Sequence, residues 1–286
     1  MSGRDRVPPN PRAWALSAAL KEVRLANGYK VIDVARSLRT SHTTISQYEN
    51  GHRLPSIETV ASILTAVHAS ADDRERVLDI ARNVHDPHWL TVGIGGISSQ
   101  LSGAIECERS AFRITEWSPM TVPGLIQTPD YALAVKAGDE FRSKDDVSSM
   151  INAGRRDIVK RLNDPVLMLA FIGETALYEP VGSRAIATDQ FRHLIQLTQQ
   201  SNVTIRIVPI GLGWHPGFSG PFVLYEFRDT KPVIHFEHHS SGAFVPDEHD
   251  VTEYRKVIDW LDRIALSCDD SVARLSKASE EMEMNT

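Results

Sequence analysis

The sequence predicts an α+β protein, with an N-terminal all-α domain of five short helices joined to a larger mixed α+β C-terminal domain. Between residues 10 and 84, apolar residues recur at helical spacing, whereas short β-branched and aromatic runs appear only beyond residue 165. The length of 286 residues suits about two domains of roughly 150 residues each. We expect the first domain over 1–85, a linker over 86–100, the second domain over 101–275 and a polar tail over 276–286.

Capping residues mark the helices of the first domain. The first helix begins at Asn10-Pro11 and ends at Asn27-Gly28, and the second spans 31–38. Each of the remaining three follows a serine that can accept a hydrogen bond from the first helical turn: Ser41, Ser56 and Ser70. The third helix turns Ile45 and Tyr48 inward.

The larger domain mixes helical and extended patterns. We expect mainly helix over 100–117, 129–163 and 188–200, and another helix with its apolar stripe between Val251 and Ile264. Runs rich in β-branched and aromatic residues predict strands at 166–172, 203–208, 222–227 and 233–237. The last residues are polar and predict a frayed end.

Charge divides the chain in a similar way. Residues 1–70 carry nine Lys and Arg against five Asp and Glu, a net charge of +4, and the remainder carries −10. A basic module attracts phosphate backbones and an acidic one repels them. Cys107 and Cys268 alone cannot build a disulfide framework or a four-cysteine zinc site. The sequence contains neither a secretory signal nor an apolar run of about 18 residues, so we expect a cytoplasmic protein.

The second and third helices, joined by Arg39-Thr40, form a candidate helix-turn-helix. The outer positions at the start of the third helix are polar, none is acidic, and all can bond base edges: His42, Thr43, Ser46 and Gln47. Cations suited to the DNA backbone surround them: Lys30, Arg36, Arg39 and Arg53. The free N–H groups behind Ser41 can also meet a phosphate. Periodicity alone leaves open a generic helical bundle with a polar face.

Several residues of this domain carry a more specific signal: Leu20, Arg24, Gly28, Ala35, Ser41, Thr44-Ile45-Ser46, Tyr48-Glu49-Asn50-Gly51 and Pro55-Ser56. Through them, residues 16–67 resemble the helix-turn-helix of phage repressors and of the XRE family of bacterial regulators. The resemblance implies that His42, Thr43, Ser46 and Gln47 face bases. It implies that Asn50 and the loop of Arg53 hold the backbone, and that Arg24 pairs with Glu49. Val31 departs from the family, which often has a phosphate-gripping glutamine there; Lys30 can substitute.

The size of one such helix predicts a dimer. A single recognition helix reads only a few base pairs, and repressors of this type commonly bind as dimers to half-sites about 10 bp apart. We therefore expect double-stranded DNA as the partner, with a homodimer on an inverted-repeat operator.

The larger domain has a second resemblance. The residues that carry it include Glu108, Val122-Pro-Gly-Leu-Ile-Gln-Thr128, Tyr131-Ala132, Glu174, Asn202-Val-Thr-Ile-Arg-Ile-Val-Pro209, His215, Glu237 and Tyr254. Residues 97–275 are similar to the uncharacterised C-terminal domain of XRE regulators from filamentous bacteria, some of which are antitoxin-like. The resemblance implies a small acidic protein, encoded nearby, as a partner.

Together these observations predict a sequence-specific transcriptional regulator whose C-terminal domain senses a protein partner or a ligand. The alternative is an antitoxin-like protein that chiefly sequesters a small partner protein and autoregulates its own operon.

Enzyme chemistry has little support in the sequence. Gly217-Phe-Ser219-Gly220 misses the G-x-S-x-G elbow, and the dipeptides Ala137-Gly138 and Ala153-Gly154 lack the serine and lysine pairing of self-cleaving repressors. We expect no catalytic residue, no metal and no cofactor.

Two features of the larger domain leave alternatives open. His235, Glu237 and His239 alternate along a predicted strand, which describes either a metal site or a strand edge with solvated histidines. Trp214, His215 and Phe218 lie in a glycine-rich segment and form a candidate ligand loop, although such aromatics more often pack a loop.

Overall fold

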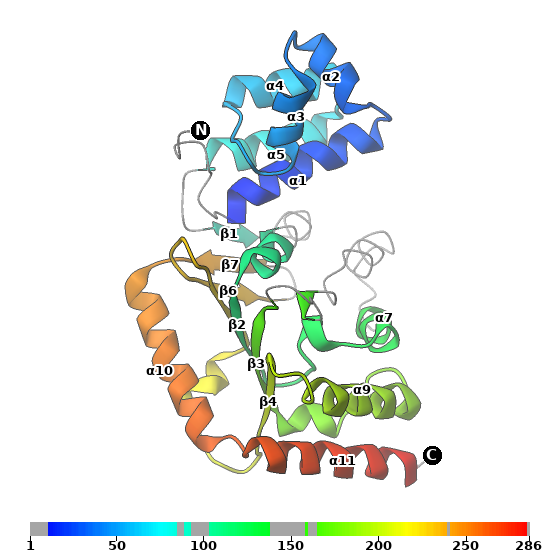
Figure 1. Ribbon diagram of the computed structural model, residues 1–286, viewed down its shortest axis with the longest axis vertical. Coiled ribbons are helices and arrows are strands. Elements are labelled where there is room, and N and C mark those ends of the chain that lie inside the picture. The colour runs from blue at the N-terminus through cyan, green and yellow to red at the C-terminus, as the bar shows by residue number, and fades with distance from the viewer. Residues whose placement is uncertain are drawn as a thin grey trace. The chain divides into compact units, whose positions relative to one another are not determined.

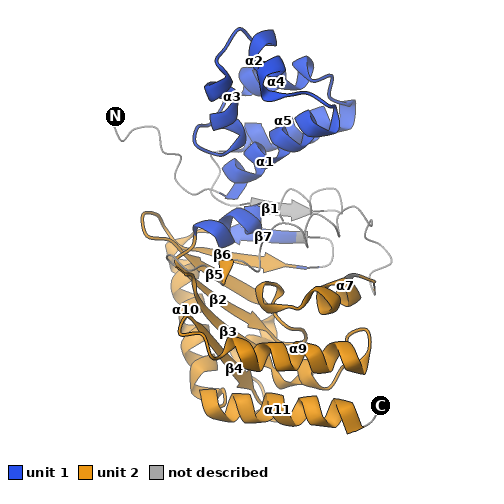
Figure 2. Cartoon of the chain, turned by 45° about the vertical axis from the view of Figure 1, so that its right-hand side comes forward, with its two compact units in different colours: residues 1–110, 238–245 blue, residues 111–237, 246–286 orange. Residues whose placement is uncertain are grey.

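The computed structural model describes residues 11–84, 89–92, 103–137, 158–159, 165–238 and 241–284. The chain splits into two compact units: unit 1 comprises residues 1–110 and 238–245, and unit 2 comprises residues 111–237 and 246–286 (Figure 2). Unit 1 begins with a helical region and unit 2 combines a mixed sheet with helices, so the predicted α+β class is confirmed. In the part of the chain that is described, no helix is both long and apolar enough to cross a membrane.

The predicted helices of unit 1 are all present (Figure 1): α1 (Pro11–Ala26), α2 (Val31–Ser37), α3 (His42–Glu49), α4 (Ile57–Ala66) and α5 (Ala71–Arg82). Ser41, Ser56 and Ser70 cap α3, α4 and α5, each hydroxyl accepting from the backbone N–H three residues later. Each cap satisfies a donor that the helix itself cannot pair, and its loss typically costs about 1 kcal/mol.

One apolar core joins these helices. The largest fully buried side chains there are Leu16, Leu20, Ile45, Ile63 and Leu64. They come from α1, α3 and α4, and Leu16 and Leu20 are four residues apart, which places them on one face of α1. Burying a side chain of this size stabilises the fold by roughly 1.5–3 kcal/mol. The core therefore holds α3 in place from its inner side.

The turn that joins α2 to α3 has a left-handed residue at its centre. Arg39 has a φ of 52°. The Arg39 N–H donates to the Arg36 carbonyl oxygen at 3.2 Å and the Thr40 N–H to the Ala35 carbonyl oxygen at 2.9 Å, which is the pattern of a Schellman C-cap. Glycine is the usual residue there, and it occupies the matching position after α3, where Gly51 has a φ of 71°.

Unit 1 also contains a strand pair. Strand β1 (Trp89–Val92) pairs antiparallel with β7 (Ser241–Val245). Residues 89–92 fall within the predicted linker and form a strand there; the rest of 86–100 lies outside the described residues. This strand could not be predicted from the sequence, because β1 is four residues long and its partner lies far away along the chain.

The sheet of unit 2 has the strand order β6-β5-β2-β3-β4. These strands are β2 (Arg113–Ser118), β3 (Leu167–Gly173), β4 (Val203–Val208), β5 (Phe222–Glu226) and β6 (Val233–Glu237). Strands β2, β3 and β4 run parallel, and β5 is antiparallel to both β2 and β6. The predicted strands at 166–172, 203–208, 222–227 and 233–237 are confirmed.

The helix predicted over 100–117 is wrong in its second half. Helix is present over 103–110, but 113–118 forms strand β2. This strand lies between β3 and β5 and pairs with both. Ile114 and Trp117 are buried in it. Tertiary pairing on both edges therefore outweighs a short helical periodicity.

Helices cover both faces of this sheet. Helix α9 (Arg184–Leu197) packs against α11 (Cys268–Met284), and α10 (Glu248–Ile264) lies on the opposite side (Figure 1). Helix α7 (Pro129–Ala137) packs against α9. The rest of the helix predicted over 129–163 lies outside the described residues, apart from 158–159.

The polar tail predicted over 276–286 is also wrong as far as Met284. Helix α11 continues to that residue. Leu275, Ala278 and Met282 are buried along it at three- and four-residue spacing. The segment contributes an apolar stripe, so it packs as a helix despite its many charges.

Candidate nucleic-acid interface

Helix α3 is fixed at its start and along its inner face. The Ser41 hydroxyl accepts from the Thr44 N–H at 3.0 Å and shares a hydrogen bond of 2.8 Å with the Thr44 hydroxyl. Ile45 is fully buried and Tyr48 is 8% exposed, as the sequence predicted. The cap and the two buried side chains set the rotation of the helix, so its remaining positions face outward.

The predicted base-reading residues lie on the outward side. His42 and Thr43 are exposed, and Ser46 and Gln47 are half-buried. They occupy positions spaced by three and four residues, so they share one side of an eight-residue helix. A helix of this length is about 12 Å long, which is close to the width of the major groove.

The predicted ion pair between Arg24 and Glu49 is present and buried. Arg24 Nε donates to Glu49 Oε1 at 2.6 Å and Nη2 donates to Oε2 at 2.8 Å, a bidentate contact. The third donor, Nη1, reaches the carbonyl oxygen of Tyr29 at 2.7 Å. The pair thus links α1, the turn before α2 and the end of α3. It also buries and neutralises the acidic residue of α3.

The predicted backbone cations Lys30, Arg36, Arg39 and Arg53 are all exposed. Arg53 lies over the Tyr48 ring, with its guanidinium carbon 5.8 Å from the ring centroid. The contact is a cation–π interaction that restrains a long side chain at the end of α3. Arg39 is presented by the turn itself, because its left-handed backbone is part of the C-cap.

Asp33 is a residue of this surface that the sequence analysis missed. One of its carboxylate oxygens accepts from the Lys30 N–H at 3.1 Å, and the other lies 3.9 Å from Arg36. An acidic residue three positions after a helix N-cap is a capping signal that could have identified it. Asp33 reduces the positive charge around the start of α2.

Asn50, which is predicted to contact the DNA backbone, is exposed, but its side-chain amide already makes hydrogen bonds within the protein. Its amide nitrogen donates to the Ser46 carbonyl oxygen at 2.8 Å and to the Ser46 hydroxyl at 3.1 Å. These bonds close the C-terminal turn of α3 and leave the hydroxyl proton of Ser46 available as a donor.

Two models of known protein families match the chain. A model described as a helix-turn-helix domain matches residues 15–77. A second model, described as a domain of unknown function (DUF5753), matches residues 101–277, more than half of the chain. The chain belongs to the DUF5753 family. Neither the curated proteins nor the solved structures gave a match. The helix-turn-helix domain indicates a DNA-binding regulator.

The candidate ligand loop lies in the DUF5753 domain, and its three aromatic residues differ in burial. Trp214 is 79% exposed and Phe218 67%, whereas His215 is 7% exposed. The His215 ring meets the rings of Trp117 and Phe218 at centroid distances of 6.2 and 4.6 Å. Burial lowers the pKa of His215. His215 therefore packs the loop, and a ligand role for the loop stays a prediction.

The metal alternative also lies in the DUF5753 domain. His235 is 5% exposed, and its ring stacks on the Tyr225 ring with the two centroids 6.4 Å apart, whereas Glu237 is exposed. His239 lies outside the described residues, so the trio stays untested. Within the described ranges, no three His, Cys, Asp or Glu side chains are grouped to hold a metal ion.

Proposed function

We propose that this member of the DUF5753 family is an XRE-type transcriptional regulator that reads a specific operator through α3. The observation that carries the proposal is the exposed side of α3. It offers His42, Thr43, Ser46 and Gln47 as groups for base edges. The acidic residue at the end of the helix, Glu49, is buried in its pair with Arg24 and so cannot repel the phosphates.

The same surface supplies groups for the DNA backbone. Lys30, Arg36, Arg39 and Arg53 are exposed around α2 and α3, and such cations bind phosphates through counterion release. Base contacts would then determine which DNA sequence is bound, while these cations fix the position of the protein on the DNA and contribute to its affinity. Asp33 is an acidic residue of this surface that we expect to oppose them.

We propose that the regulator acts in the cytoplasm as a homodimer on an inverted repeat. One eight-residue helix spans only a few base pairs, which is too little to select one site in a genome. Two copies on half-sites about 10 bp apart would double the recognised sequence. A footprint without two-fold symmetry would contradict this part of the proposal.

We also propose that the DUF5753 domain controls DNA binding by sensing a protein partner or a ligand. The chain beyond residue 70 carries a net charge of −10, so it has no electrostatic reason to bind DNA itself. Purification from the native host tests this: a stoichiometric partner that weakens operator binding supports sensing. A partner that is bound with no effect on the operator favours the antitoxin-like alternative.

The central test separates base reading from backbone binding. The operator is first selected from random DNA with the full chain, and affinities are then measured over a range of salt concentrations. We expect Gln47→Ala to cost about 1–3 kcal/mol on the operator and little on unrelated DNA. We expect Arg53→Ala to weaken both and to reduce the salt slope by about one.

Arg82→Ala is the matched control for charge, because Arg82 is an exposed cation in the last turn of α5, away from α3 in the sequence. It should leave operator affinity and salt slope near those of the unmodified chain. The proposal fails if Gln47→Ala weakens operator and unrelated DNA equally, or if Arg53→Ala behaves like Arg82→Ala.

A further inference from the structure

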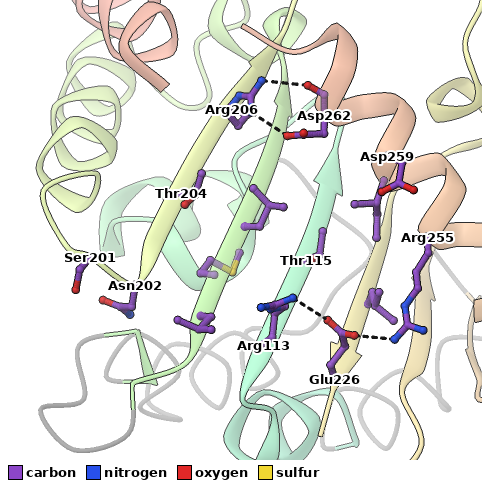
Figure 3. Close-up of a pocket in the computed structure, with 15 residues that line it drawn as sticks. Arg113, Thr115, Ser201, Asn202, Thr204, Arg206, Glu226, Arg255, Asp259 and Asp262 are labelled. Atoms are coloured by element: carbon purple, nitrogen blue, oxygen red, sulfur yellow. Dashed lines mark hydrogen bonds and ion pairs between the residues drawn. The ribbon is translucent and has the colours of Figure 1, made fainter. Parts of the chain in front are cut away.

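A groove of about 610 Å³ lies in unit 2 between the sheet and α10 (Figure 3). Its lining comes from β2, β3, β4, β5 and α10. The volume falls in the range of small-molecule sites. The sequence analysis did not single out any of its residues as a ligand site.

One end of the groove has an excess of positive charge. Glu226 accepts a hydrogen bond from Arg255 Nη2 at 2.7 Å, whereas Arg113 Nη1 stays 3.9 Å from the same carboxylate. Two guanidinium groups thus share one carboxylate, which gives this end a net charge of +1 (Figure 3). The guanidinium carbon of Arg113 also lies 5.9 Å from the centroid of the Phe112 ring. Within the described part of the chain, Arg113 has no hydrogen bond to an acidic side chain, so guanidinium donors are left for a ligand.

The other end has an excess of negative charge. Arg206 Nη1 pairs with Asp262 at 2.8 Å, and other donors of Arg206 bond the carbonyl oxygens of Asp262, Leu266 and Ala265. Asp259 also lines this part of the groove, and among the described residues no ion pair neutralises it. Arg206, Asp259 and Asp262 together carry −1.

The floor of the groove mixes apolar and polar side chains. Leu169 of β3, Leu224 of β5 and Ile258 of α10 line it together with Thr115 and Thr204. Leu167, which lies opposite Arg113 in the strand register, is 41% exposed, so apolar surface is open to a ligand beside Arg113. A ligand that complements all three features has an anionic end, an apolar body and a cationic end.

The spacing of the charged groups limits the length of that ligand. Arg113 lies opposite Glu226 in the strand register, and Glu226 is held by Arg255. Asp259 follows Arg255 by four residues on α10, which is a rise of about 6 Å. An extended peptide spans about 3.5 Å per residue. Because Arg113 and Arg255 share the Glu226 carboxylate, a chain of two or three residues is long enough to extend from that end of the groove toward Asp259.

We propose that this groove binds a free apolar peptide of two or three residues in its zwitterionic form. The carboxylate accepts hydrogen bonds from Arg113, the ammonium donates to Asp259, and the side chains cover the leucine floor. The inference concerns unit 2 alone, so its failure would leave DNA binding by unit 1 untouched, and the reverse also holds.

The test is calorimetric titration of the full chain, without DNA, with L-leucyl-L-leucine and with leucyl-leucyl-leucine. Two further ligands are N-acetyl-leucyl-leucine, which lacks the ammonium, and leucyl-leucinamide, which lacks the carboxylate. We expect saturable binding of the free peptides and a loss of about tenfold or more for each blocked form, as for a hydrogen bond to a charged group. These comparisons need no protein variant, so they stay decisive if a variant misfolds.

Variants then assign each end. Asp259→Asn should weaken the free peptide but not the N-acetylated one, and Arg113→Gln should weaken the free peptide but not the amide. Matched controls are Glu253→Gln, on the same helix but outside the groove lining, and Lys277→Gln on α11; both should bind like the unmodified chain. Absence of saturable binding, or binding indifferent to both blocked ends, overturns the proposal.

Discussion

Replacing Glu49 by alanine tests whether the buried pair with Arg24 organises the DNA-binding surface. In Glu49→Ala, Arg24 stays nearly buried and keeps only its bond to the Tyr29 carbonyl oxygen. A buried charge that has lost its partner costs about 3–5 kcal/mol. Small domains have total stabilities of roughly 5–15 kcal/mol, so we expect this variant to lose much of the stability of unit 1.

The double variant Arg24→Met with Glu49→Leu removes both charges and tests the origin of that cost. It leaves no buried charge, and its main loss is the bond to the Tyr29 carbonyl oxygen. A buried acceptor left without a partner costs about 1–3 kcal/mol. We therefore expect the double variant to be more stable than Glu49→Ala, although it removes more interactions.

Hydrogen exchange of the full chain, read by mass spectrometry on peptides from α1 and α3, measures the opening free energy of unit 1 separately from unit 2. Arg76→Ala is the control, because Arg76 pairs with Asp73 at 3.0 Å near the surface and such pairs contribute about 0–1 kcal/mol. The reasoning is refuted if the double variant is as unstable as Glu49→Ala, or if Glu49→Ala costs no more than the control.

Two further predictions concern single positions. Arg39→Gly should stabilise unit 1 by about 1 kcal/mol, because glycine adopts the left-handed conformation without strain; hydrogen exchange measures this gain. The same substitution removes a cation, so it should reduce the salt slope of DNA binding, which a salt titration measures. Burial lowers the pKa of His215 below 6.5, so the unfolded chain takes up its proton first as the pH falls. The unfolding free energy of unit 2 should therefore decrease below about pH 6.5, and urea titrations of His215→Leu should show a smaller decrease.

The helices of unit 1 could be predicted because their signals are local. Ser41, Ser56 and Ser70 act within their own first turns, and Gly51 ends α3 through its own backbone conformation. The left-handed Arg39 could not be predicted from its residue type, since arginine does not favour that region. The turn after α2 is instead imposed by the packing of α2 and α3.

The parts of the fold that were mispredicted depend on distant partners. Strand β2 is sandwiched between β3 and β5, and β1 pairs with β7, which lies about 150 residues later. Neither pairing produces a pattern that can be recognised in a short window of sequence. The end of α11 was mispredicted for a related reason: Ala278 and Met282 are buried among many charged neighbours, so the apolar stripe is thin.

The outward position of the candidate base-reading residues could be predicted from the sequence, but the side-chain contacts around them could not. Exposure of His42 and Thr43 follows from the inward positions of Ile45 and Tyr48. Two contacts depend on side-chain conformations: the hydrogen bond by which Asp33 caps α2, and the cation–π contact between Arg53 and Tyr48. The groove between the sheet and α10 could not be predicted, because its lining residues come from four separate strands and from α10.

The Arg24–Glu49 pair bears on both the stability of unit 1 and the proposed binding of DNA. An acidic residue on a recognition helix normally opposes DNA, since a carboxylate about 4 Å from a phosphate is repelled by about 1 kcal/mol even in water. Here Glu49 is 7% exposed and accepts hydrogen bonds from two donors of Arg24, so its charge is neutralised inside the domain. The same two bonds that fix α3 against α1 therefore keep the outer side of α3 free of acid. If α3 reads DNA as proposed, we expect a variant that releases Glu49 to weaken DNA binding, because α3 loses its link to α1 and the Glu49 carboxylate loses the partner that neutralises it.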